Sequence, residues 1–266
     1  MRVRSYAKIN WSLRITAKRS DGYHDLETLF QTISLHDVLT FRPSERLTLT
    51  CTDPTIPTDD RNLVIRAAQA LGISRVSIEL EKRIPAGGGL GGGSSNAAAT
   101  LVALDRMFDL RRNDLPELAL SLGSDVPFFL VGGTAYATGR GEALTRVASR
   151  AGIPLLLLLP RERVSTREAF SRVGRYSPAI GPDAYRCWKH FSNDFEPSVF
   201  SFHPSLRHLK DRLRDAGAEW AAMTGSGSTI VGAFADETSR DAAAATFPDV
   251  RTERCESIDA PGALIE

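Results

Sequence analysis

The sequence contains little of what metal sites, disulfide frameworks and membrane spans require. Its 266 residues include only three cysteines, Cys51, Cys187 and Cys255, which lie far apart and lack the spacing of metal ligands. The longest apolar run, residues 153–159, is too short to cross a bilayer, and the N-terminus shows no apolar signal region. We therefore expect a reduced, cytoplasmic protein without disulfides and without a membrane partner.

An excess of charge of one sign is also missing. The 33 basic and 32 acidic side chains leave a formal net charge of +1, so the totals do not favour binding to nucleic acid. The composition is otherwise that of a globular protein, and the length suits one large domain or two smaller ones. We expect no nucleic-acid partner.

Glycine, by contrast, is concentrated in one segment, residues 85–95. The segment lies between an alternating strand, 76–82, and an alanine-rich helix, 96–108, for which Ser94, Ser95 and Asn96 are good capping types. Glycines let backbone amides converge on an anion, and a helix N-terminus adds unpaired N–H groups and partial positive charge. We therefore predict that nucleotide phosphates bind to this loop, which consists of Pro85, Ala86, Gly87, Gly88, Gly89, Leu90, Gly91, Gly92, Gly93, Ser94 and Ser95.

The residues that follow the glycines limit the class of phosphate-binding loop to which this segment can belong. A Walker loop needs a lysine after its last glycine, and Ser94 stands there instead. The glycine spacing also satisfies the dinucleotide pattern, but Asp105 and Asp109 come too early to be the acid that ends a second strand. A nicotinamide-dependent oxidoreductase therefore remains a minor alternative, and a nucleoside triphosphate loop of another class is favoured.

Two features precede this loop. Apolar and polar residues alternate over 9–15, which predicts a half-buried strand with Lys8 on the same face as Asn10. From this pattern alone, exposure of Lys8 to solvent is the simpler interpretation. Asp21 and Gly22 then indicate a turn, where Tyr23 and His24 offer a stacking face and an imidazole to a planar ligand, although an ordinary hairpin turn fits as well.

The remainder of the chain divides near residue 152. Asp125 precedes an apolar segment, 128–131, which we predict as a strand paired in a hairpin with 134–138, so that Asp125 is either a local cap or a partly buried base. Residues 155–256 follow the order β, α, β, β, α, β of a ferredoxin-like domain, with an extra helical insertion. We predict two domains, 1–152 and 153–266.

Three motifs together resemble those of the GHMP kinases (galactokinase, homoserine kinase, mevalonate kinase, phosphomevalonate kinase). They are Ala-Lys-Ile-Asn at 7–10, the glycine loop at 85–95, and Met-Thr-Gly-Ser-Gly-Ser-Thr at 223–229. The resemblance implies a two-domain α+β fold, with an N-terminal domain like ribosomal protein S5 domain 2, a ferredoxin-like C-terminal domain and an active site in the cleft between them. It also implies ATP with Mg²⁺ as co-substrate and no prosthetic group.

Within the family, the chain is similar to the branch that phosphorylates the 2-hydroxyl of a cytidine diphosphate-linked methylerythritol in the non-mevalonate isoprenoid route. The similarity lies in Lys8, Asn10, the Asp-Gly-Tyr-His turn at 21–24, and Ser-Asp-Val-Pro at 124–127. By this resemblance Asp125 accepts the proton of the substrate hydroxyl. The resemblance also implies that Lys8 would stabilise the developing alkoxide and hold Asp125 ionised.

The same resemblance assigns the remaining site residues. The adenine would be held by Asn62 and Lys82, and Mg²⁺ contacted by Ser95. The cytosine would be bound by three residues, the edge by His24 and the two faces by Tyr23 and Phe170. The erythritol or phosphate end would be placed by Asn10, with Thr166 a further candidate.

The resemblance leaves some alternatives open. We expect a monomer or a weak homodimer. A kinase of another small alcohol in the same family is one alternative. A catalytically silent nucleotide-binding regulator is another, against which the presence of both Lys8 and Asp125 argues.

Overall fold

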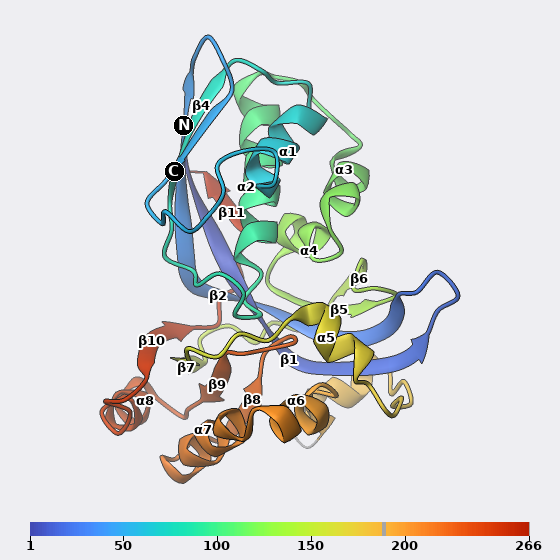
Figure 1. Ribbon diagram of the computed structural model, residues 1–266, viewed down its shortest axis with the longest axis vertical. Helices are drawn as coiled ribbons and strands as arrows, with labels where there is room; N and C mark the ends of the chain where they lie inside the picture. The colour runs from blue at the N-terminus through green and yellow to red at the C-terminus, as the bar shows by residue number, and fades with distance from the viewer. Residues whose placement is uncertain (188–189, 266) are drawn as a thin grey trace.

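The computed structural model describes residues 1–187 and 190–265, so residues 188, 189 and 266 of the predicted second domain lie outside it. Two sheets form the centre of the molecule, and helices cover the outer side of each (Figure 1). Among the described residues, no helix combines the length and the apolar character needed to cross a membrane.

The larger sheet has the order β11-β1-β2-β4-β3, with β5 paired to β2 and β6 to β5. Its strands are β1 (Arg2–Lys18), β2 (His24–Pro43), β3 (Thr48–Cys51), β4 (Val76–Glu81), β5 (Thr134–Thr138), β6 (Ala143–Arg146) and β11 (Ala263–Ile265). The helices on its outer side are α1 (Leu63–Ala70), α2 (Gly92–Met107), α3 (Leu115–Leu122) and α4 (Val126–Val131).

The smaller sheet is antiparallel throughout, in the order β10-β7-β9-β8. Its strands are β7 (Pro154–Leu159), β8 (Trp220–Met223), β9 (Ile230–Ala233) and β10 (Arg251–Glu256). The helices of this half are α5 (Thr166–Ser171), η1 (Pro182–Arg186), α6 (Glu196–Phe202), α7 (Pro204–Asp215) and α8 (Glu237–Ala244). The predicted ferredoxin-like order is confirmed, with α7 and α8 as its two helices and α5, η1 and α6 as an insertion between β7 and α7.

Three apolar cores follow from this layering. One joins the larger sheet to α1–α4, another joins the smaller sheet to α6, α7 and α8, and the third lies between the sheets around Ile9, Trp11 and Trp220. Because side chains alternate along a strand, Ile9 and Trp11 enter this third core while Lys8 and Asn10 face the other way. The predicted boundary at 152/153 stays a prediction, and β11 from beyond it pairs with β1 in the larger sheet.

Two local predictions were wrong. Residues 126–131 form the short helix α4 rather than a strand, because Pro127 occupies its first turn and Phe128 and Phe129 are buried in the helical layer. Tertiary packing here overrides the strand preference of an apolar aromatic run. Helix α2 begins at Gly92, four residues earlier than predicted, with Gly91 as its cap and no capping side chain.

The end of β4 is tied to β2 by a buried ion pair. Asp37 is fully buried, lies 2.8 Å from Lys82 Nζ, and accepts hydrogen bonds from the backbone N–H groups of Arg83 and Ile84 at 2.7 and 2.8 Å. A buried charge is tolerated only when it is paired and hydrogen-bonded. Asp37 therefore determines the position from which the chain continues into the glycine loop.

Asp37→Ala is expected to lower the free energy of unfolding by about 3–5 kcal/mol, because it leaves the Lys82 ammonium group buried without its partner. Denaturant unfolding measures the loss. The matched control is Glu81→Ala, which breaks an exposed ion pair with Arg83 on the same strand end and is expected to cost about 1 kcal/mol or less. Equal losses in the two variants would contradict this assignment.

Candidate active site

A cleft of about 880 Å³ opens beside β1 and β2. One end is lined by Lys8, Asp125 and three residues of the glycine loop, Gly89, Gly91 and Ser94. The other end is lined by the 21–24 turn and Phe170 of α5. The loop between β8 and β9 contributes Gly225 and Ser226. Residues from both halves of the chain therefore line one cleft.

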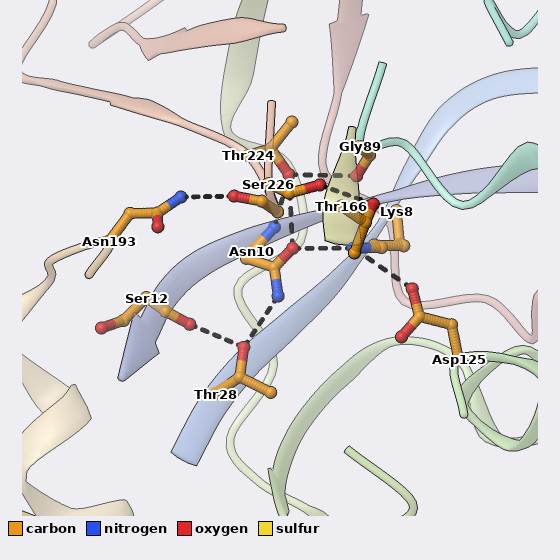
Figure 2. Close-up of polar contacts among 11 residues, drawn as sticks. Lys8, Asn10, Ser12, Thr28, Gly89, Asp125, Thr166, Asn193, Thr224 and Ser226 are labelled. Carbon is orange, nitrogen blue, oxygen red and sulfur yellow. Dashed lines mark hydrogen bonds and ion pairs between the residues drawn. The ribbon is translucent and has the colours of Figure 1, made fainter. Parts of the chain in front are cut away.

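Lys8 and Asp125 face each other at the first end of this cleft. Lys8 Nζ lies 3.5 Å from Asp125 Oδ2 and donates to Asn10 Oδ1 at 2.7 Å (Figure 2). The lysine side chain is 4% exposed, whereas the Asp125 side chain, at the N-terminus of α4, is 38% exposed. The interpretation of Lys8 as a solvent-exposed residue was therefore wrong, because the loop and α4 cover this face of β1. The pair places a cation beside a carboxylate that a ligand can reach.

Asn10 is held by a chain of hydrogen bonds that orients its amide. Its Nδ2 donates to Thr28 Oγ1 at 2.8 Å, and Thr28 donates onward to the Ser12 carbonyl at 2.7 Å (Figure 2). The amide oxygen is thereby directed at Lys8. The backbone N–H of Asn10 donates to Thr224 Oγ1 at 3.0 Å. Thr28 and Thr224 thus hold Asn10 in the orientation in which its amide oxygen accepts from Lys8.

The glycine loop closes over β1 at very short range. The Lys8 N–H donates to the Leu90 carbonyl at 3.0 Å. Gly91 has φ of 70°, and a Cβ there would lie 2.7 Å from the Phe129 ring and 3.1 Å from Lys8 Cγ. Gly89, with φ of 78°, approaches the Thr224 carbonyl so closely that a Cβ would lie 2.2 Å from it. Glycine is required at both positions.

The N-terminus of α2 completes this end of the cleft. Gly89, Gly91 and Ser94 line the cleft, and the first turn of the helix contains no acidic side chain. The unpaired N–H groups of a 16-residue helix and its dipole favour an anion at this position. This is the geometry expected of a phosphate-binding loop.

The other end of the cleft is aromatic. His24 stacks on Phe170 with ring centroids 4.9 Å apart and planes at 20°, while Tyr23 is 52% exposed. The Arg140 guanidinium carbon lies 4.6 Å from the centroid of the Tyr23 ring. Burial, and next the charge of Lys18, lower the pKa of His24 below its ordinary value of 6.5. The imidazole is therefore neutral at neutral pH, with one nitrogen to donate and one to accept.

Three predicted ligands lie apart from this cleft. Asn62 caps α1 by accepting from the Val64 N–H at 2.9 Å, and Lys82 Nζ is engaged with Asp37. Ser95 is fully buried, and its hydroxyl donates to the Tyr6 carbonyl at 2.6 Å. None of these three residues is among those that line the cleft. Their assignments stay predictions, and this geometry does not favour the Ser95 contact with magnesium.

Thr166 lines the cleft, and its hydroxyl is 2.9 Å from that of Ser226. Several lining residues were not predicted from the sequence: Lys18, Thr28, Arg140, Arg167, Tyr176 and Ser226. For Ser226 the signal was present, because the 223–229 motif had been recognised without a role. Arg140, Arg167 and Tyr176 stand in no motif, and only the fold brings them to the cleft.

Comparison with known proteins agrees with this geometry. A model of the GHMP kinases N terminal domain matches residues 62–133, and one of the GHMP kinases C terminal matches residues 178–250. The chain is 43% identical over 252 residues to the 4-diphosphocytidyl-2-C-methyl-D-erythritol kinase of Chlorobium limicola, covering 87% of this chain and 88% of that protein. The protein of that name from Prosthecochloris aestuarii is 43% identical over 262 residues, covering 91% and 92%.

Solved structures extend the comparison. A crystal structure of 4-(cytidine 5'-diphospho)-2C-methyl-D-erythritol kinase matches with a TM-score of 0.86 at 35% identity, covering 97% of this chain and 99% of that one. Homoserine kinase from Cytophaga hutchinsonii shares the fold, with a TM-score of 0.73 at 18% identity, covering 99% and 96%. The chain therefore belongs to the GHMP kinases and, within them, to the family of the 4-diphosphocytidyl-2-C-methyl-D-erythritol kinases.

Proposed function

We propose that this kinase transfers the γ-phosphoryl group of ATP to the 2-hydroxyl of 4-diphosphocytidyl-2-C-methyl-D-erythritol, in the non-mevalonate route to isoprenoid precursors. The names of its relatives support the substrate. The observation that carries the proposal is one cleft with a lysine–aspartate pair at one end and a histidine among aromatic rings at the other. Such a cleft suits a substrate with an alcohol at one end and a nucleobase at the other.

In the proposed reaction, Asp125 accepts the proton of the 2-hydroxyl, and the oxygen attacks the γ-phosphorus. The bond from the γ-phosphorus to the bridging oxygen breaks, and ADP leaves. Lys8 stabilises the negative charge that develops on the attacking oxygen. The loop amides and the start of α2 bind the phosphates of ATP, which suits a reaction that depends mainly on positioning and charge stabilisation.

At the other end, neutral His24 would form hydrogen bonds with the edge of the cytosine, and Tyr23 and Phe170 would pack on its faces. One face of the Phe170 ring is already stacked on His24, so the cytosine would contact the part of the Phe170 ring that His24 leaves uncovered. Magnesium would supply charge neutralisation on the phosphates of ATP. The cytoplasmic location and the monomeric or weakly dimeric state stay predictions from the sequence.

The direct test is ADP release with Mg-ATP, measured separately with the cytidyl substrate, mevalonate and homoserine. We expect turnover with the cytidyl substrate alone. Turnover with another alcohol instead would leave the phosphate loop and the Lys8–Asp125 pair in place but overturn the nucleobase subsite. A protein that releases no ADP with any of them would contradict the proposed substrate and leave a phosphate loop without an assigned reaction.

Asp125→Asn and Lys8→Ala are each expected to lower kcat by about a hundredfold or more, since each removes a group that acts on the transferring atoms. Steady-state kinetics and circular dichroism of the same samples check rate and folding together. Asp109→Asn, at an exposed aspartate away from the cleft, serves as the control and should keep the wild-type rate. A folded Asp125→Asn enzyme with full turnover would exclude Asp125 as the base.

The pKa of His24 sets a pH dependence for substrate binding. Because that pKa is lowered, His24 stays neutral down to pH values below 6.5. We expect the KM for the cytidyl substrate to be constant from about pH 8 to the ordinary histidine value of about 6.5, and to rise only at lower pH. Lys18→Met removes the nearby charge and should move the rise toward higher pH. If the KM of the wild type already increases while the pH is lowered from 8 to 6.5, this role of His24 is refuted.

A further inference from the structure

The carboxylate of Glu27 is buried in a place that the proposed chemistry does not use. Glu27 lies on β2 and is 1% exposed. Its neighbours Leu26 and Thr28 line the cleft, so the alternation of the strand places Glu27 on the opposite face of β2. An ionised carboxylate in such a position must be satisfied by donors.

Four groups donate to this carboxylate, and three of them belong to one segment. The backbone N–H groups of Ile180 and Gly181 donate at 3.0 and 3.1 Å, and the Tyr185 hydroxyl donates at 2.7 Å. The fourth donor is the Tyr136 hydroxyl of β5, at 3.0 Å. Burial alone would raise the pKa of Glu27, but these hydrogen bonds outweigh it and lower the pKa. Glu27 therefore fastens residues 180–185 to the larger sheet as an ionised acceptor.

The same segment reaches the cleft at its other end. Tyr176 lines the cleft, is 42% exposed, and lies 6.2 Å from His24 between ring centroids, at an angle of 40°. The next residue, Ser177, donates its N–H to the Ile15 carbonyl of β1 at 2.9 Å. Residues 176–185 are thus attached to β1 at Ser177 and to β2 through Glu27, with the tyrosine ring on the cleft side.

We propose that Tyr176 is a further wall of the nucleobase subsite, beside Tyr23, His24 and Phe170, and that Glu27 is the positioning residue that holds it there. This inference rests on the proposed function and names a specificity determinant within it. The Tyr176 ring contributes an aromatic contact to a pyrimidine that enters beside His24. Glutamine cannot replace Glu27, because its NH₂ group would face donors where the carboxylate offers a second acceptor.

The test compares wild type, Tyr176→Ala, Glu27→Gln and the double variant in the ADP-release assay. Tyr176→Ala is expected to raise the KM for the cytidyl substrate about three- to tenfold, the usual range for one aromatic contact, and to leave the KM for ATP and kcat unchanged. Glu27→Gln should raise the same KM. In the double variant the KM should rise no further than in the more affected single variant, because both changes remove one contact.

Two controls separate positioning from folding. Tyr136→Phe removes the donor to Glu27 that lies outside the segment, and is expected to lower the melting temperature while leaving the KM for the cytidyl substrate unchanged. Phe108→Ala removes a partly exposed aromatic ring away from the cleft and should leave the KM unchanged. Calorimetric titration measures the same contact without turnover. Tyr176→Ala and Glu27→Gln should each bind cytidine 5'-diphosphate more weakly than wild type does, and should bind ATP as wild type does.

Each outcome bears on one hypothesis. If wild type turns over the cytidyl substrate and Tyr176→Ala keeps its KM, the inference fails and the proposed function stands. If Glu27→Gln lowers the melting temperature but keeps the KM, Glu27 supports the fold only and its positioning role is overturned. If wild type does not turn over the cytidyl substrate at all, the proposed function itself fails.

Discussion

The buried ammonium group of Lys8 is the constraint on which the rest of the cleft depends. A lysine that is 4% exposed must have its charge balanced and its donors accepted close by. Asp125 supplies the charge and Asn10 the acceptor, and Asn10 is in turn oriented by Thr28. These partners come from β1, β2 and the start of α4, so the balance is met only when the sheet and helical layer are assembled. The group that stabilises charge in the proposed reaction is thereby held rigid before substrate binds.

The two halves of the chain meet where backbone approaches backbone. Gly89 lies against the Thr224 carbonyl, and the Thr229 N–H donates to the Gly88 carbonyl at 3.4 Å. Side chains at these glycines would separate the phosphate loop from the loop between β8 and β9. Both loops also contact β1. The side chains on one face of β1 pack in the core between the sheets, and those on its other face line the cleft. One strand therefore couples packing of the two halves to the geometry of the cleft.

Local patterns were sufficient for most elements but failed where burial decided the outcome. Alternation predicted β1, and the β, α, β, β, α, β order predicted the smaller sheet, because period and turn residues act over short distances. The run of Phe128 and Phe129 read as a strand, since apolar composition alone does not distinguish a buried strand from a short buried helix. Ser94, Ser95 and Asn96 have the types of capping residues, yet α2 begins before them at Gly92.

By itself, the sequence determined the family and the position of the glycine loop, because both are carried by contiguous motifs. The catalytic roles of Lys8 and Asp125 were implied only by the resemblance, and they stay predictions. The tertiary structure alone decided that Lys8 is buried, that Asn62 caps α1, and that Lys82 pairs with Asp37. It also brought Arg140 and Tyr176 to the aromatic end of the cleft, with Glu27 on the opposite face of β2. The physical reason is distance along the chain. Glu27 and Ile180 are separated by 153 positions, and no local pattern reports a contact that only the folded sheet creates.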